Sequence, residues 1–172
     1  MNNSLILTLI GPDKPGLVEM VSATLAEHHA SWQQSSMSRL AGKFAGILIA
    51  SVDSQQLQPL TEALSRLESK GLKITIEADD KVADKREGQA ISLELIGHDK
   101  PGIVRHISQA LASHGISVDR LETAMVSGSM SAEQLFKAEA DLLVPTGVDI
   151  DELQDTLEAI ASDLMVDITL NN

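Results

Sequence analysis

Two copies of one short sequence carry the residues best suited to binding a small anion. Residues 11–16 read Gly-Pro-Asp-Lys-Pro-Gly, and residues 97–102 read Gly-His-Asp-Lys-Pro-Gly. Each follows an alternating apolar run and precedes an amphipathic run, so each is predicted to be a strand-to-helix turn. The start of a helix offers backbone N–H groups without internal acceptors, and such groups bind carboxylates and phosphates. The two turns are therefore the first candidate binding sites.

In this interpretation the N–H groups at both helix starts bind a ligand carboxylate, and one lysine in each turn adds positive charge. The candidate residues are Asp13, Lys14, Pro15, Gly16 and Leu17 in the first copy and Asp99, Lys100, Pro101, Gly102 and Ile103 in the second. The alternative is structural, because Pro and Gly also make tight turns without any ligand. A third reading is asymmetric, with one functional turn and one relic. The sequence leaves these readings open.

The turns belong to an internal repeat. Residues 5–32 align without gaps with residues 91–118, and 14 of the 28 aligned positions are identical. Each copy continues as strand, helix, hairpin, helix and strand. The hydrophobic pattern predicts strands at 5–10, 31–40, 43–52 and 73–77 and helices at 17–28 and 56–70 in the first copy. The second copy is predicted to have strands near 117–126, 135–144 and 166–170 and a last helix at 149–164.

This order predicts an α+β fold made of two ferredoxin-like βαββαβ domains, each an antiparallel four-stranded sheet with two helices on one face. We place the domains at residues 1–78 and 90–172, joined by a charged linker at 79–89, and expect them to pack side by side. Open sheet faces and edge strands also lead us to expect a homodimer.

Composition excludes several classes of function. The net charge is -12, and residues 90–172 account for -10 of it. A phosphate backbone would be repelled, and aromatic residues are only 2% of the chain, so we expect no direct nucleic-acid binding. The chain has no Cys, which excludes disulfides and thiol nucleophiles. With neither a signal segment nor an apolar run of membrane length, we expect a cytoplasmic protein that does not contact membranes.

Other polar residues have mainly structural interpretations. Glu94, Glu139 and Asp141 are expected to line an open sheet face with Ser92, and no nucleophile-and-base set, phosphate loop or cofactor fingerprint accompanies them. We therefore expect no enzyme activity, no cofactor and no metal. The acidic residues at 149–158 suit a helix N-terminus, with a docking patch for a basic partner as the alternative. His98 and His106 flank the second turn, where a ligand or pH-dependent role is the alternative to simple exposure.

A βαββαβ unit whose first strand closes on Asp-Lys-Pro-Gly resembles the ACT domain family, and residues 7–18 and 93–104 carry this motif in both copies. The resemblance implies that domains pair side by side and that amino acids bind at the interface, between the first turn and the start of the second strand. Those strand starts correspond to Ser31 and Ser117, where many amino-acid-binding members have Asn. It further implies a regulatory protein, responsive to glycine or a similar amino acid, that modulates transcription through a protein partner such as a transcriptional activator. A ligand-free protein-interaction module is the alternative.

Overall fold

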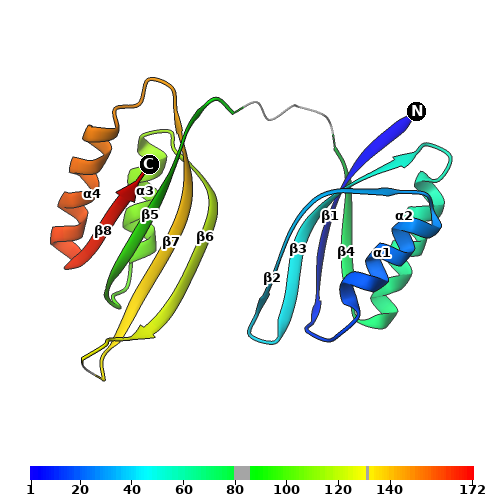
Figure 1. Cartoon of the computed structure of the whole chain (residues 1–172), viewed down its shortest axis with the longest axis horizontal. Coiled ribbons are helices and arrows are strands. Elements are labelled where there is room, and N and C mark those ends of the chain that lie inside the picture. The colour runs from blue at the N-terminus through cyan, green and yellow to red at the C-terminus, as the bar shows by residue number, and fades with distance from the viewer. Residues whose placement is uncertain (80–85, 131) are drawn as a thin grey trace. The chain divides into compact units, whose positions relative to one another are not determined.

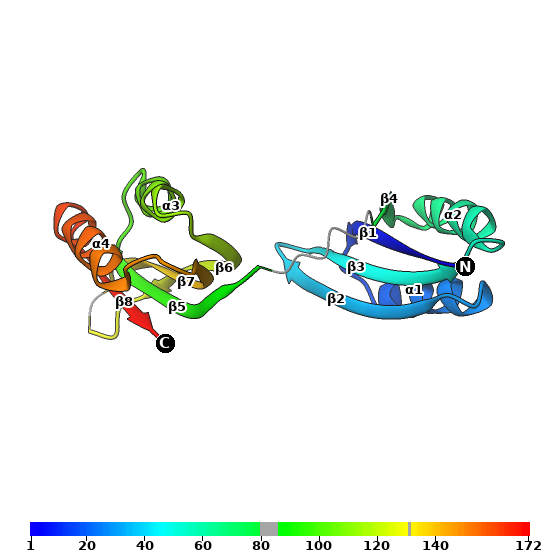
Figure 2. The same cartoon turned by 90° about the horizontal axis from the view of Figure 1, so that it is seen from above.

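The chain forms two compact units, 1–84 and 85–172, hereafter unit 1 and unit 2. The computed structural model describes residues 1–79, 86–130 and 132–172. Within these residues each unit contains one antiparallel four-stranded sheet and two α-helices, which confirms the predicted α+β class of two βαββαβ units (Figure 1). The helices α3 and α4 of unit 2 lie on the same side of their sheet (Figure 2).

Unit 1 follows the predicted order of elements. Its elements are β1 (Asn2–Pro12), α1 (Leu17–Glu27), β2 (Ser31–Leu40), β3 (Lys43–Asp53), α2 (Leu57–Ser65), the 3-10 helix η1 (Arg66–Lys70) and β4 (Lys73–Ala78). The sheet order is β2-β3-β1-β4, so β2 and β4 are the edge strands. The single helix predicted at 56–70 is thus an α-helix that tightens into a 3-10 turn before Gly71, which has a left-handed φ of 91° and ends the helix.

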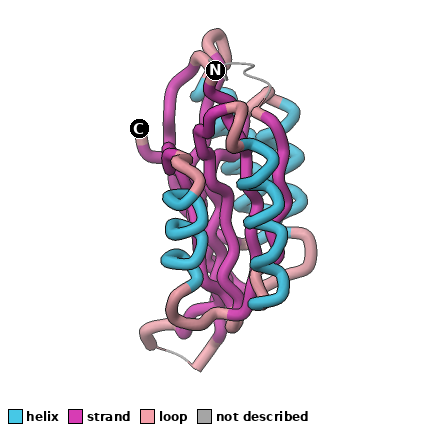
Figure 3. The backbone as a smooth tube through the Cα atoms, turned by 90° about the vertical axis from the view of Figure 1, so that its right-hand side faces the viewer, coloured by secondary structure: helices cyan, strands magenta, loops and turns pink. Residues whose placement is uncertain are grey.

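Unit 2 repeats this arrangement. Its elements are β5 (Gly88–His98), α3 (Ile103–Ser113), β6 (Ser117–Ser127), β7 (Gln134–Pro145), α4 (Ile150–Leu164) and β8 (Val166–Asn171). The sheet order is β6-β7-β5-β8, with β6 and β8 at the edges. Figure 3, in which unit 1 faces the viewer, shows that the strands and helices of such a unit run alongside one another and that the loops joining them lie at their ends.

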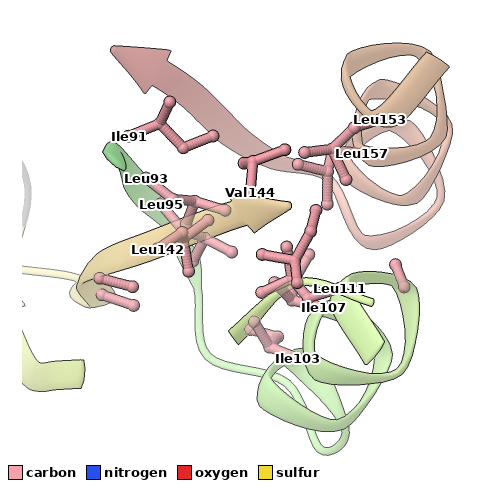
Figure 4. Close-up of a cluster of buried hydrophobic side chains, with 14 of the residues drawn as sticks. Ile91, Leu93, Leu95, Ile103, Ile107, Leu111, Leu142, Val144, Leu153 and Leu157 are labelled. Carbon is pink, nitrogen blue, oxygen red and sulfur yellow. The ribbon is translucent and has the colours of Figure 1, made fainter. Parts of the chain in front are cut away.

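Alternation along the strands explains why each sheet carries helices on one face only. Leu93 and Leu95 are buried while Glu94 between them is exposed, so one face of β5 packs into the core and the other meets solvent. Helices α3 and α4 cover the buried face with Ile107 and Leu157, among others (Figure 4). Unit 1 has its own core, in which α1 and α2 cover the equivalent face.

The predicted linker, 79–89, falls mostly outside the described residues, which omit 80–85. Strand β5 begins at Gly88, inside the predicted linker. The exact domain limits, and the side-by-side packing of the two domains, stay predictions. In the described part of the chain no helix has both the length and the apolar composition needed to cross a membrane.

Candidate functional site

Each Asp-Lys-Pro-Gly turn connects the first strand of its unit to the first helix. Gly16 and Gly102 occupy the N-cap positions with left-handed φ values of 94° and 92°, which a residue with a side chain adopts only with strain. The next residues, Leu17 and Ile103, are buried, so only their backbone N–H groups can serve a ligand. Neither N-cap has a side chain that accepts from the helix start, so these N–H groups remain suited to an outside acceptor.

In unit 1 the polar groups of the turn bind within the protein. Asp13 pairs with Arg39 of β2, and the Asp13 N–H donates to the Gly42 carbonyl oxygen at 2.9 Å. The Lys14 ammonium donates to the Lys70 carbonyl oxygen, 3.0 Å away at the end of η1. These contacts favour the structural reading of the first turn, because its charged side chains already have partners.

In unit 2 the charged side chains of the equivalent turn do not have such partners among the described residues. Among the described residues, neither Asp99 nor Lys100 forms an ion pair or a side-chain hydrogen bond. His106 lies over the turn instead, and its Nδ1 donates to the Gly102 carbonyl oxygen at 2.6 Å. His98 Nε2 lies 3.7 Å from a carboxylate oxygen of Glu133. The two turns therefore differ in the partners of their Asp and Lys side chains.

The starts of β2 and β6, at Ser31 and Ser117, do not lie close to the turn of the same unit. Strand β3 pairs Ser51 with both Ser31 and Ser4, whereas its other end pairs Lys43 with Leu40 and with Pro12 beside the turn. Ser31 therefore lies at the opposite end of the sheet from the turn. About nine residues of extended strand separate the two ends, which corresponds to about 30 Å. Ser31 Oγ accepts a hydrogen bond from Gln33. Ser117 occupies the same place in unit 2, opposite Leu143 of β7.

A pocket in unit 2 was not predicted from the sequence. It lies between α3, the edge strand β6 and the inner face of the sheet, and has a cavity volume of about 50 Å³; all of its lining residues except Ser108 are apolar. The lining comes from α3, β5, β6 and β7 and comprises Leu93, Leu95, Ile103, Val104, Ile107, Ser108, Leu111, Val118, Leu121, Phe136, Ala138 and Ala140. Two of these, Ile103 and Val104, directly follow the second turn.

The open face of the unit 2 sheet carries the predicted carboxylates. Ser92 lies opposite Asp141, and Glu94 lies opposite Glu139, as the alternation predicted. Arg120 donates to Asp141 at 2.7 Å, and Lys137 lies 2.8 Å from Glu139. The hydrogen bond from the Lys137 ammonium lowers the pKa of Glu139 below its ordinary value. Glu139 is therefore held as an anion, and an ion-paired exposed carboxylate is a poor general acid or base near neutral pH.

Within the described residues, no three His, Cys, Asp or Glu side chains come close enough to hold a metal ion.

The two histidines at equivalent positions of the repeat, His28 and His114, each contact a neighbouring group at the end of a helix. His28 Nδ1 lies 3.3 Å from Oε1 of Gln56, and His114 Nδ1 donates to the Ala110 carbonyl oxygen at 2.9 Å.

Comparison with known proteins identifies these units. The family model for the ACT domain matches twice, at residues 3–78 and 89–171. The chain belongs to the ACT domain family. The duplicated Asp-Lys-Pro-Gly turns and the two sheets are thus the first turns and sheets of tandem ACT domains.

Individual relatives cover one or both ACT domains. UPF0237 protein MK1213 of Methanopyrus kandleri is 30% identical over 78 residues, which are 44% of this chain and 87% of that protein. An unknown protein from Galdieria sulphuraria has a TM-score of 0.82 at 26% identity, covering 99% of this chain and 98% of its own. A chain described as a "putative glycine cleavage system transcriptional repressor" has a TM-score of 0.74 at 18% identity, covering 99% and 97%. At this identity, the similarity between that chain and this one shows that they share a fold.

Proposed function

We propose that this tandem ACT protein is a non-enzymatic regulator that binds a free amino acid, glycine or a similar one, and modulates transcription through a protein partner. The observation that carries the proposal is the duplicated turn, which presents helix-start N–H groups in both ACT domains and, in unit 2, the side chains of Asp99 and Lys100 without partners among the described residues. The name of the structurally similar repressor supports the link to glycine and to transcription.

Charge supports a protein partner over direct contact with nucleic acid. Unit 2 carries most of the net charge of -12, and a transcriptional activator with a basic surface would complement it. We include a homodimer in the proposal, because β2 and β6 each leave one strand edge open for pairing.

Isothermal titration calorimetry of the full chain tests ligand binding. Glycine, serine, alanine, valine and leucine are titrated separately into the folded protein at one salt concentration. Saturable heat from any of them supports the proposed function. If none gives heat although circular dichroism shows the folded protein, the ligand-free interaction module is the correct reading.

A further inference from the structure

The open face of the unit 1 sheet, on the side away from its helices, is apolar at its centre, whereas the same face of unit 2 is charged. The aligned repeat relates β1 to β5, and the strand registers then relate β3 to β7. Three positions are apolar on β3 and charged on β7, and the corresponding residues are Ala45 and Lys137, Ile47 and Glu139, and Ile49 and Asp141. Unit 2 therefore shows that this sheet forms without isoleucine at these positions.

The apolar residues of this face are contiguous and accessible to solvent. They are hereafter the isoleucine patch, which consists of Ile6 and Ile10 on β1 and Ala45, Ile47 and Ile49 on β3. Ile10 is 46% exposed and Ile47 is 54% exposed. The neighbouring positions on the edge strands are mostly polar and uncharged, namely Gln34, Ser36 and Ser38 on β2 and Thr75 on β4. An exposed apolar patch with a polar rim is typical of an interaction surface.

The face is large enough to bind a partner of its own kind. Strands β1 and β3 have 11 residues each and β4 has 6. With about 3.3 Å per residue and about 4.8 Å between strands, the four strands cover about 500–600 Å². Two such faces bury about 1,000–1,200 Å², which reaches the size of a specific interface. The open face of unit 2 is a poor match, because its ion pairs would lose their hydration against isoleucine.

Charge complementarity indicates how two copies of this face meet. The registers define three rows across the sheet, which are Lys73, Ile10 and Ala45, then Thr75, Thr8 and Ile47, then Glu77, Ile6 and Ile49. A two-fold axis along the middle row places the first row of one copy over the third row of the other. Lys73 then faces Glu77 of the second copy, and the small Ala45 faces the larger Ile49. Among the described residues, neither Lys73 nor Glu77 has an ion pair or a side-chain hydrogen bond within its own chain.

We propose that the open face of unit 1 binds the same face of a second copy of the chain, in a two-fold dimer whose sheets pack face to face. Ile47 of each copy meets Ile47 of the other on the axis, and two symmetric ion pairs between Lys73 and Glu77 lie at the rim. This interface differs from the open strand edges of β2 and β6, and it does not depend on amino-acid binding.

Analytical ultracentrifugation of the full chain over a concentration series tests the interface, and the wild-type chain should show a monomer–dimer equilibrium. Ile47→Glu introduces the residue type that unit 2 carries at the equivalent position. Because it brings two carboxylates together on the axis, it should raise the dissociation constant of the dimer at least about 100-fold. The matched control is Val18→Glu, which adds the same charge at an α1 residue that is 47% exposed. It should leave the dissociation constant unchanged.

Charge reversal tests the direction of the two-fold axis. Lys73→Glu sets two glutamates against each other at two symmetric places, so it should weaken the dimer at least about 10-fold. Glu77→Lys should weaken it similarly, by setting two lysines against each other. The double variant restores opposite charges, and its dissociation constant should return to within about threefold of the wild-type value.

A chain that stays monomeric at every concentration overturns the proposal, as does a dimer that Ile47→Glu leaves intact. Dissociation by Val18→Glu instead would place the interface on the helix side of the unit. If Ile47→Glu does not fold by circular dichroism, the charge reversals decide, because no weakening, or no recovery in the double variant, overturns the arrangement. Calorimetry with the five amino acids on the Ile47→Glu monomer separates this result from the proposed function, since ligand heat there supports amino-acid binding whatever the oligomeric state.

Discussion

The contact between His106 and Gly102 predicts that the two turns respond differently to the same substitution. Gly16 and Gly102 have nearly the same backbone conformation, with φ of 94° and 92°. A Cβ at Gly16 would meet no atom within 4 Å, whereas a Cβ at Gly102 would lie 3.2 Å from both Cε1 and Nδ1 of His106. Alanine at either position therefore adds the same backbone strain, and only at Gly102 must a neighbouring side chain move.

The expected size follows from these two contributions. A left-handed residue with a Cβ costs about 1–2 kcal/mol, and the loss of unfolded-state freedom on Gly→Ala returns about 0.4–1 kcal/mol. Gly16→Ala should thus destabilise unit 1 by about 0.5–1 kcal/mol. At Gly102 the His106 ring must also shift away from the new Cβ, which lengthens its 2.6 Å bond to the carbonyl oxygen. Because a hydrogen bond contributes about 0.5–1.5 kcal/mol, weakening this one should make Gly102→Ala cost more than Gly16→Ala, by up to about twofold.

Native-state amide hydrogen exchange measures the two effects separately, using the buried strands β1 and β5 as reporters. The control is the same Gly102→Ala change in a His106→Ala background, where its cost should fall to that of Gly16→Ala. Equal destabilisation of the two units in the original background would refute the reasoning, as would an unchanged Gly102→Ala cost after His106 is removed.

Other predictions test the helix cap, the ion pairs and the first turn. Asp149 accepts from the Asp151 N–H at 2.9 Å, so Asp149→Ala should cost unit 2 about 1 kcal/mol, measured by thermal unfolding; no change would contradict the capping role. Because Lys137 lowers the pKa of Glu139, the pair stabilises unit 2 above the ordinary glutamate pKa, and this contribution is lost as pH falls through the lowered value. Carbon-detected NMR titration should show the Glu139 midpoint rising in Lys137→Met; an unmoved midpoint would exclude the pair. Lys14→Met should destabilise unit 1 by at most about 1 kcal/mol, because the hydrogen bond from Lys14 to the Lys70 carbonyl oxygen is exposed to solvent. Urea unfolding followed by Trp32 fluorescence measures this loss, and a larger one would contradict the assignment of Lys14 to this single exposed bond.

Local pattern was sufficient to predict the fold because the sheets have one buried and one exposed face. Leu93 and Leu95 alternate with Ser92 and Glu94, and this period-two pattern specifies both the strand and its orientation. The repeat extends the same strand assignment to unit 1. There the alternation is less clear, because the apolar Ile6 stands at the position equivalent to Ser92.

The candidate site was only partly predictable. The turns were found because their residues are contiguous in sequence. The engagement of Lys14 with the Lys70 carbonyl joins residues 56 positions apart, and no local pattern reports such a bond. The separation of Ser31 from the turn follows from the parallel course of β1 and β2, which the predicted element order already implied.

The pocket could not be predicted, because its lining comes from α3, β5, β6 and β7, which are far apart in the sequence. No local pattern reports the space left between such elements once they pack.

Residue-resolved NMR titration of the full chain with glycine, serine, alanine, valine and leucine, each added separately, tests the central claim most directly. The account predicts that at least one of them gives saturable shifts of the backbone amides at a helix start, at Gly102 and Ile103 or at the equivalent Gly16 and Leu17. The absence of saturable shifts at both turns with all five amino acids at millimolar concentration would contradict it.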